Sequence, residues 1–280
     1  MSAPATNEPA SSGPEGAVKV SVCLQKGGVG KSTTTLNLAR AGAVQGLRVL
    51  VADMDPQGNA TAALATSPVG PREVGIADAL APEPDYTLGE VVIDTIWPGV
   101  SLAPAVTRPL TKVEKLISVE PTGREHFARD AFEPVCGDYD LILFDTPPAL
   151  GLLTTNALTA SDRVLVVAEG EQWSTDGLAE LRRTVEDVRR YSNPALTWAG
   201  VLINKWRNTK AERELVDEIE QHFPQAPVWP ERVRLWESIR THRDAGLGLD
   251  ESRESRLRVL ADDYGAMITR LMNPVGQVPA

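Results

Sequence analysis

The chain has 280 residues, 42% of them hydrophobic, and a formal net charge of −10. This length allows one large α/β domain to bury a full core, which we favour over two smaller domains. No apolar run reaches the roughly 20 residues of a membrane span, and the first residues lack a signal-peptide pattern, so we expect a cytoplasmic protein without membrane association. The charge excludes a polycation overall, although a local basic face remains compatible with it.

Both ends of the chain are expected to be unstructured. Residues 1–17 are mostly Ala, Pro, Ser, Gly and Glu, which cannot offset their ordering entropy, so we predict a disordered tail. A folded domain should then span 18–272, followed by a flexible tail at 273–280. Cys23 and Cys136 have no partner at metal-ligand spacing, and we interpret both as core thiols.

Short β-rich runs alternate with helical segments along the domain. Apolar runs at 18–24, 48–53, 141–144, 163–168 and 198–203 indicate strands, and the spacing of apolar residues predicts helices over 32–45, 177–190 and 211–223. Gly46 is a plausible stop for the first helix. Continuous apolar strands are typical of parallel sheets covered on both faces. We therefore predict a doubly wound α/β fold with a mostly parallel sheet, helices on both faces and a ligand at the carboxyl ends of the strands.

The first strand leads into a glycine-rich turn and then a helix. Residues 26–33 read KGGVGKST. In such a turn the backbone N–H groups cradle phosphate oxygens, here at Gly27, Gly28, Val29 and Gly30. Lys31 would supply charge to the β- and γ-phosphates, Ser32 a hydroxyl to Mg²⁺, and Thr33 a donor to the α-phosphate.

The turn departs from the standard phosphate-binding motif at its start. Gln25 occupies the usual place of the first glycine, and an extra lysine, Lys26, follows. This pattern resembles the deviant Walker A motif of the ParA/MinD family of P-loop NTPases. The resemblance implies ATP and Mg²⁺ as cofactors and a homodimer formed with ATP, in which Lys26 reaches the nucleotide of the other subunit.

Two acidic segments extend this resemblance. Residues 53–61, DMDPQGNAT, are similar to a segment typical of ParA proteins, and residues 141–148, LILFDTPP, resemble the Walker B strand and second switch of the family. By resemblance, Asp55 orients the attacking water, which makes Lys26, Lys31 and Asp55 the candidate catalytic residues. Asp53 lies nearer the metal, and Asp145 can hold Mg²⁺ through a water ligand, with Ser32 as the third candidate metal residue.

Weaker signals point to the adenine base. Asn204 follows a predicted strand where relatives keep a side chain for the adenine edge, and Pro230 stands where the family's IPR segment passes the base. A strand-end turn is nearly as good an interpretation of Asn204. Trp206 could stack on the base, but core packing ranks first.

The segment after Pro230 indicates DNA binding. Residues 232–237, RVRLWE, resemble the family's NVRLAE stretch, in which Arg234 matches an arginine for sequence-independent DNA binding. The SxGK run that follows in relatives is replaced here, and we expect Arg240 and Arg243 to substitute for its charge. A solvated helix face explains these arginines equally well. The predicted helix at 252–271 is amphipathic and core-facing, and the residues after it lack the lysines of a membrane anchor.

The resemblance covers nearly the whole domain and implies a nucleoid-associated ATPase that partitions DNA with a ParB-like partner. A ParA-like ATPase for another cargo is the first alternative. A biosynthetic ligase of the same fold, a reductase similar to the nitrogenase iron protein and a non-hydrolysing scaffold are less favoured. The reductase needs cluster-bridging cysteines, whereas Cys23 lies inside the first predicted strand.

Overall fold

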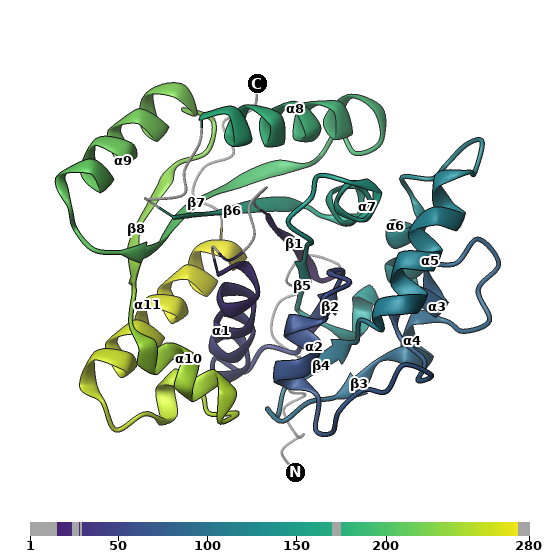
Figure 1. Cartoon of the computed structure of the whole chain (residues 1–280), viewed down its shortest axis with the longest axis horizontal. Helices are drawn as coiled ribbons and strands as arrows, with labels where there is room; N and C mark the ends of the chain where they lie inside the picture. The colour runs from purple at the N-terminus through teal and green to yellow at the C-terminus, as the bar shows by residue number, and fades with distance from the viewer. Residues whose placement is uncertain (1–15, 24–27, 29, 170–174, 274–280) are drawn as a thin grey trace, which may run out of the picture.

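The computed structural model describes residues 16–23, 28, 30–169 and 175–273, without the side chains of residues 107, 108, 175 and 176. Its strands form one sheet in the order β3-β4-β2-β5-β1-β6-β7-β8, parallel except for the β3–β4 pair (Figure 1). The strands are β1 (Val18–Cys23), β2 (Val49–Asp53), β3 (Ile93–Asp94), β4 (Val100–Ala103), β5 (Leu141–Asp145), β6 (Arg163–Glu169), β7 (Thr197–Trp206) and β8 (Val228–Arg234).

Helices cover both faces of this sheet, which confirms the predicted doubly wound α/β fold. The helices are α1 (Lys31–Val44), α2 (Asn59–Leu64), α3 (Ile76–Ala79), α4 (Leu88–Val91), α5 (Thr107–Ser118), α6 (Phe127–Phe132), α7 (Leu152–Ala160), α8 (Thr175–Tyr191), α9 (Lys210–His222), α10 (Glu237–Asp244) and α11 (Ser255–Met272). Helices α1, α2, α10 and α11 lie on one face, and α3 to α9 lie on the other (Figure 1). Short 3-10 turns occur at Glu133–Asp138 (η1) and Leu249–Glu251 (η3).

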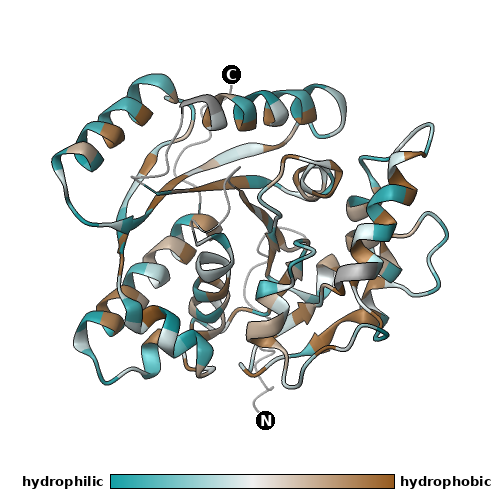
Figure 2. Ribbon diagram, viewed as in Figure 1, coloured by the Kyte–Doolittle hydropathy of each residue, from teal (hydrophilic) through white to brown (hydrophobic). Residues whose placement is uncertain are grey.

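The strands are apolar along their length because both faces are buried. Leu141 and Leu143 of β5 pack into the core under α1 and α11, whereas Ile142 and Phe144 between them pack into the opposite core. Successive side chains of a strand point to opposite faces, so two covered faces require a continuous apolar run. Hydrophobic residues accordingly face the interior in both layers, and hydrophilic residues mark the outer helix surfaces (Figure 2).

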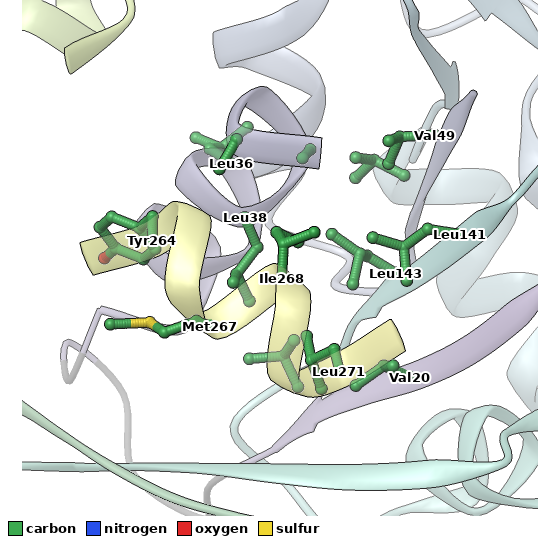
Figure 3. Packing of buried hydrophobic residues seen from close by; sticks show 14 of the residues in the cluster. Val20, Leu36, Leu38, Val49, Leu141, Leu143, Tyr264, Met267, Ile268 and Leu271 are labelled. Carbon is green, nitrogen blue, oxygen red and sulfur yellow. The ribbon is translucent and has the colours of Figure 1, made fainter. Parts of the chain in front are cut away.

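The last helix completes the first core. Tyr264, Met267, Ile268 and Leu271 of α11 are buried, and Figure 3 shows Ile268 beside Leu38 of α1 and Leu271 beside Val20 of β1. The expected core-facing role of this segment is therefore confirmed. No helix within the described ranges is long and apolar enough to cross a membrane.

The predicted strands and helices match the observed ones to within a few residues. Gly46 has a φ of 85° just after α1, as expected for a helix stop. Ala17, placed in the tail by sequence, is buried, and its N–H donates to the Cys136 carbonyl over 3.1 Å. Residues 1–15 and 274–280 of the predicted tails lie outside the described ranges.

The sequence analysis did not predict strands β3, β4 and β8, of which β8 contains Pro230. A proline cannot donate to a ladder, so a proline within an apolar run argues against an interior strand. The sheet order places β8 at the edge, where a missing donor is tolerated. Its exposed Pro230 is thus part of a strand rather than a loop.

Long-range contacts fix the segment between α10 and α11 against the rest of the domain. The Arg40 guanidinium of α1 donates to both carboxylate oxygens of Asp250, over 2.9 and 2.7 Å. Trp97 Nε1 donates to the Gly246 carbonyl over 3.0 Å. These contacts hold α10 beside the first turns of α1, next to the candidate site.

Candidate nucleotide-binding site

The site is built where β1, between β5 and β6, ends and α1 begins. Gly28 and Gly30 have φ angles of 81° and 93°, a left-handed conformation that glycine adopts readily. A Cβ at Gly30 would also collide with the side-chain amide nitrogen of Asn204. The described part of the turn therefore has the backbone of a phosphate cradle, with α1 starting at Lys31. Lys26, Gly27 and Val29 lie outside the described residues.

Lys31 is buried among acidic groups. Its side chain is 6% exposed. Burial lowers the pKa of Lys31, whereas the nearby Asp145, Cys23 and Asp55 raise it. The ammonium charge thus belongs to an electrostatic cluster that includes two of the predicted carboxylates, and the first helical turn adds Ser32 and Thr33.

Asp145, at the end of β5, has a buried oxygen suited to a cation. The Thr35 hydroxyl donates to Asp145 Oδ1 over 3.3 Å, whereas Oδ2 is buried without a hydrogen-bond partner among the described residues. Burial raises the pKa of Asp145 to about 6, and the Ser32 hydroxyl and Lys31 lower it. A cation here would relieve the desolvation of the carboxylate, so the residues fit Mg²⁺ held through Ser32 and a water on Asp145.

Asp53 lies opposite Asp145 in the β2–β5 register, but its oxygens are engaged. Its Oδ2 accepts hydrogen bonds from the Thr61 backbone N–H and hydroxyl, both over 2.7 Å, and its Oδ1 accepts the Asp55 N–H over 3.2 Å. Burial and then Asp145 raise the pKa of Asp53 to about 8, against these hydrogen bonds. Asp53 therefore fastens the start of α2 to the end of β2, a role that sequence reasoning missed.

Asp55 is held in a turn directly after β2. Its Oδ1 accepts the Gln57 N–H over 2.9 Å, and its side chain is 6% exposed. Gly58, with a φ of 64°, then starts α2. The turn places the Asp55 carboxylate in the same electrostatic cluster as Lys31, where the terminal phosphate would lie.

A cavity of about 470 Å³ adjoins the glycine turn and α1. Its lining combines backbone of the turn, the end of β7 and the connection from β8 into α10, and consists of Gly28, Gly30, Thr33, Asn204, Lys205, Val233, Arg234, Leu235, Trp236, Glu237, Ile239, Arg240 and Arg243. Asn204 is thus brought to the turn. Pro230 and Trp206 do not contribute to the lining, and Trp206 packs its ring near the Arg232 guanidinium, 5.7 Å from the ring centre.

The three arginines predicted for DNA binding gather at the same cavity. Arg234 and Arg240 are exposed and Arg243 is half-buried. Arg240 lies 3.7 Å from Glu237, and Arg243 pairs with its neighbour Asp244 over 2.7 Å. The fold therefore collects these charges on one surface at the cavity beside the glycine turn.

The sequence analysis did not single out Thr61, which supports Asp53, or Trp236, which lines the cavity, although both residues are recognisable in the sequence. Thr61 is the last residue of the DMDPQGNAT segment, so the motif itself marked it as a candidate. Trp236 stands where the family's NVRLAE stretch has alanine, and a large aromatic residue in place of a small one marks a local difference in packing. Lys205 donates to the buried Glu169 over 2.9 Å and has a φ of 54°, a feature without a sequence signal.

Comparisons with known proteins agree with this geometry. The family described as an AAA domain matches residues 17–198. The chain is 36% identical over 224 residues to the chromosome partitioning protein ParA of Myxococcus xanthus, covering 77% of each chain. It is 37% identical to the sporulation initiation inhibitor protein Soj of Bacillus subtilis, over 78% of this chain and 86% of Soj.

A solved structure also matches over most of the chain. Cobyrinic acid a,c-diamide synthase from Mycobacterium smegmatis superposes with a TM-score of 0.77 and 26% identity, covering 94% of this chain and 98% of that one. In its complex with ADP and magnesium the TM-score is 0.72 and the identity 30%, over 82% of this chain and 92% of that one.

Proposed function

This chain belongs to the AAA domain family and to the ParA/Soj family of partition ATPases, and we propose that it is a Mg²⁺-ATP-dependent dimerising switch that binds nonspecific DNA and segregates a chromosome or plasmid. The observation that carries the proposal is the gathering of Lys31, Asp55 and Asp145 at the start of α1. Phosphoryl transfer needs positioned charges and an oriented water more than covalent chemistry.

Each residue of this cluster has a part in hydrolysis. The glycine turn and Lys31 hold the phosphates, and Thr33 donates to the α-phosphate. Ser32 and Asp145 would hold Mg²⁺, which supplies charge neutralisation at the phosphates when bound, and Asp53 supports this side of the site from β2. Asp55 accepts a hydrogen bond from the attacking water and aligns it with the terminal phosphate. The Asp55 turn leads into α2, so this segment can respond to loss of that phosphate.

The remaining parts of the proposal concern partners. Lys26 would reach the nucleotide of a second subunit, so that ATP closes a homodimer. Arg234, Arg240 and Arg243 would then hold the phosphate backbone of nucleoid DNA without reading its sequence. A ParB-like centromere-binding protein would accelerate hydrolysis and release the dimer.

The direct test is ATP turnover by the full chain, with and without nonspecific duplex DNA, alongside particle size in solution. We expect turnover, an ATP-dependent dimer, and loss of that dimer in Lys26→Ala while ATP still binds. A chain that stays monomeric with ATP, or whose turnover is indifferent to Lys26→Ala, would show the dimer proposal to be wrong.

DNA binding is tested separately with Arg234→Glu. We expect weaker, still ATP-dependent DNA binding, measured at saturating ATP because Arg234 also lines the cavity beside the glycine turn. Arg183→Glu, at an exposed arginine of α8, is the matched control and should leave DNA affinity unchanged. If both variants bind DNA equally well, the DNA-binding surface does not include Arg234 and lies elsewhere than β8 and α10.

Two alternatives remain open to the same assays. A ParA-like ATPase that positions another cargo would turn over ATP but ignore a ParB-like partner. The similarity to the M. smegmatis synthase favours, as a second candidate, a nucleotide-dependent biosynthetic ligase of the same fold. Such a ligase would need a small-molecule substrate for turnover, and DNA would not stimulate it.

A further inference from the structure

We propose that the indole of Trp236 is the stacking platform for the nucleobase, an inference that rests on ATP binding as proposed above. The glycine turn fixes the phosphate end of the nucleotide at Gly28, Gly30 and Thr33. The 470 Å³ cavity begins at those same residues and extends to the β8–α10 connection. A nucleoside leaving the turn therefore enters this cavity, and Trp236 lies in its wall.

Trp236 is suited to stacking by its type and its surroundings. Among the described residues that line the cavity it is the one aromatic side chain, with aliphatic Val233, Leu235 and Ile239 nearby. A purine gains most from a flat aromatic partner, and Trp236 is the ring that this described wall offers. The amide of Asn204, packed over Gly30, is one of the polar groups of the same cavity, together with Lys205, Glu237 and the three arginines.

The ring is held in place rather than free to turn away. Trp236 is half-buried and packs against the core beneath α1 and α11. The Arg256 guanidinium lies over one face of the ring, 5.3 Å from its centre, and donates to Glu254 over 2.7 Å and to the Ser238 hydroxyl over 3.3 Å, so a base would stack on the opposite face. A pre-positioned ring loses little entropy when a base stacks on it.

The position of Trp236 also connects the base to the basic surface. Trp236 caps the start of α10, and its carbonyl accepts the Ile239 N–H over 3.2 Å. The same helix carries Arg240 and Arg243. A base that contacts Trp236 therefore steadies the helix that presents these two arginines, so nucleotide occupancy and the arginine surface share one element.

Stacking has a chemical signature that differs from hydrogen bonding. Every base has a π-face, so a stack strengthens binding of all nucleotides with little discrimination between them. Trp236→Ala should weaken ATP and GTP by a similar factor, roughly 5- to 150-fold in dissociation constant, the range expected for loss of one base–aromatic stack. Trp236→Phe keeps an aromatic face and should recover most of this affinity.

The experiment measures dissociation constants of the full chain for ATP and GTP with Mg²⁺ by titration calorimetry, in wild type, Trp236→Ala and Trp236→Phe. Trp206→Ala is the control, because that ring lies outside the cavity lining, and it should bind ATP like the wild type. Intrinsic fluorescence is the second readout. ATP should quench the wild type, which has six tryptophans, and quenching should be lost in Trp236→Phe although the other five remain.

The outcomes separate the two proposals. If the wild type binds ATP but Trp236→Ala binds it equally well, or if Trp236→Phe retains the full quenching, the stacking role is wrong and the ATPase proposal stands. If Trp236→Ala does not fold, the Trp236→Phe fluorescence decides. A wild type that binds no ATP overturns the ATPase proposal and the stacking role with it.

Discussion

Replacement of Thr61 by valine tests how the acidic segment after β2 is held. Valine keeps the shape of threonine and removes only its hydroxyl. That hydroxyl donates to Asp53 Oδ2 over 2.7 Å and accepts the Ala105 N–H over 2.8 Å. Thr61 and Ala105 are both buried, so water does not replace the lost group.

The cost follows from these two contacts. Loss of the hydrogen bond to Asp53 removes about 1–1.5 kcal/mol, and leaving the Ala105 N–H buried without its acceptor costs about 1–3 kcal/mol. The free energy of unfolding of Thr61→Val should therefore fall by about 2–4 kcal/mol. Thr61→Ser keeps the hydroxyl and loses one methyl group, so it should lose about 1 kcal/mol.

The assay is urea denaturation without nucleotide at pH 7, followed by circular dichroism, for the wild type and both variants. The order of midpoints should be wild type, Thr61→Ser, Thr61→Val. A Thr61→Val protein within about 0.5 kcal/mol of the wild type, the usual range of a neutral surface change, would refute the proposed anchoring of α2 through Asp53.

Three further predictions concern charge and backbone. Because burial raises the pKa of Asp53 to about 8, the native state without nucleotide holds a proton that the unfolded chain releases, so its free energy of unfolding should fall as pH rises from about 4 to about 8. Urea denaturation at several pH values should show that, in Asp53→Asn, the free energy of unfolding no longer falls between about pH 6 and 8. Below pH 6 a decline should remain, because burial also raises the pKa of Asp145, to about 6. A double-mutant cycle of Arg40→Ala and Asp250→Ala should give a coupling of about 1–2 kcal/mol, since the pair is two-pronged and half-buried, and a value near zero would contradict its role. Gly30→Ala puts a Cβ at a left-handed φ and against the Asn204 side chain. Holding the turn in its phosphate-binding shape should then cost about 1–2 kcal/mol, so the dissociation constant for ATP, measured by calorimetry, should rise at least about fivefold. Gly137→Ala, whose Cβ would meet nothing within 4 Å, should bind ATP normally.

The sequence alone determined the fold class and which residues became candidates for the phosphate site. Strands buried on both faces read as continuous apolar runs, and helices read by their apolar spacing, because both signals are local. The carboxyl ends of neighbouring parallel strands meet at one edge, so Asp53 at the end of β2 and Asp145 at the end of β5 were predictable neighbours of each other. The pairing of Asp53 with Asp145 in register agrees with that reasoning.

Only the tertiary structure decided which side chains from distant segments complete the site. The amide of Asn204 lies over Gly30, Thr61 bridges Asp53 to Ala105, and Trp236 enters the cavity while Trp206 does not. These contacts join residues far apart in the chain, and they depend on strand order and on the packing of α10 against α1. A one-dimensional pattern carries the periodicity of each element but not the relative placement of elements, so the sequence did not show that Pro230 lies exposed on the edge strand β8.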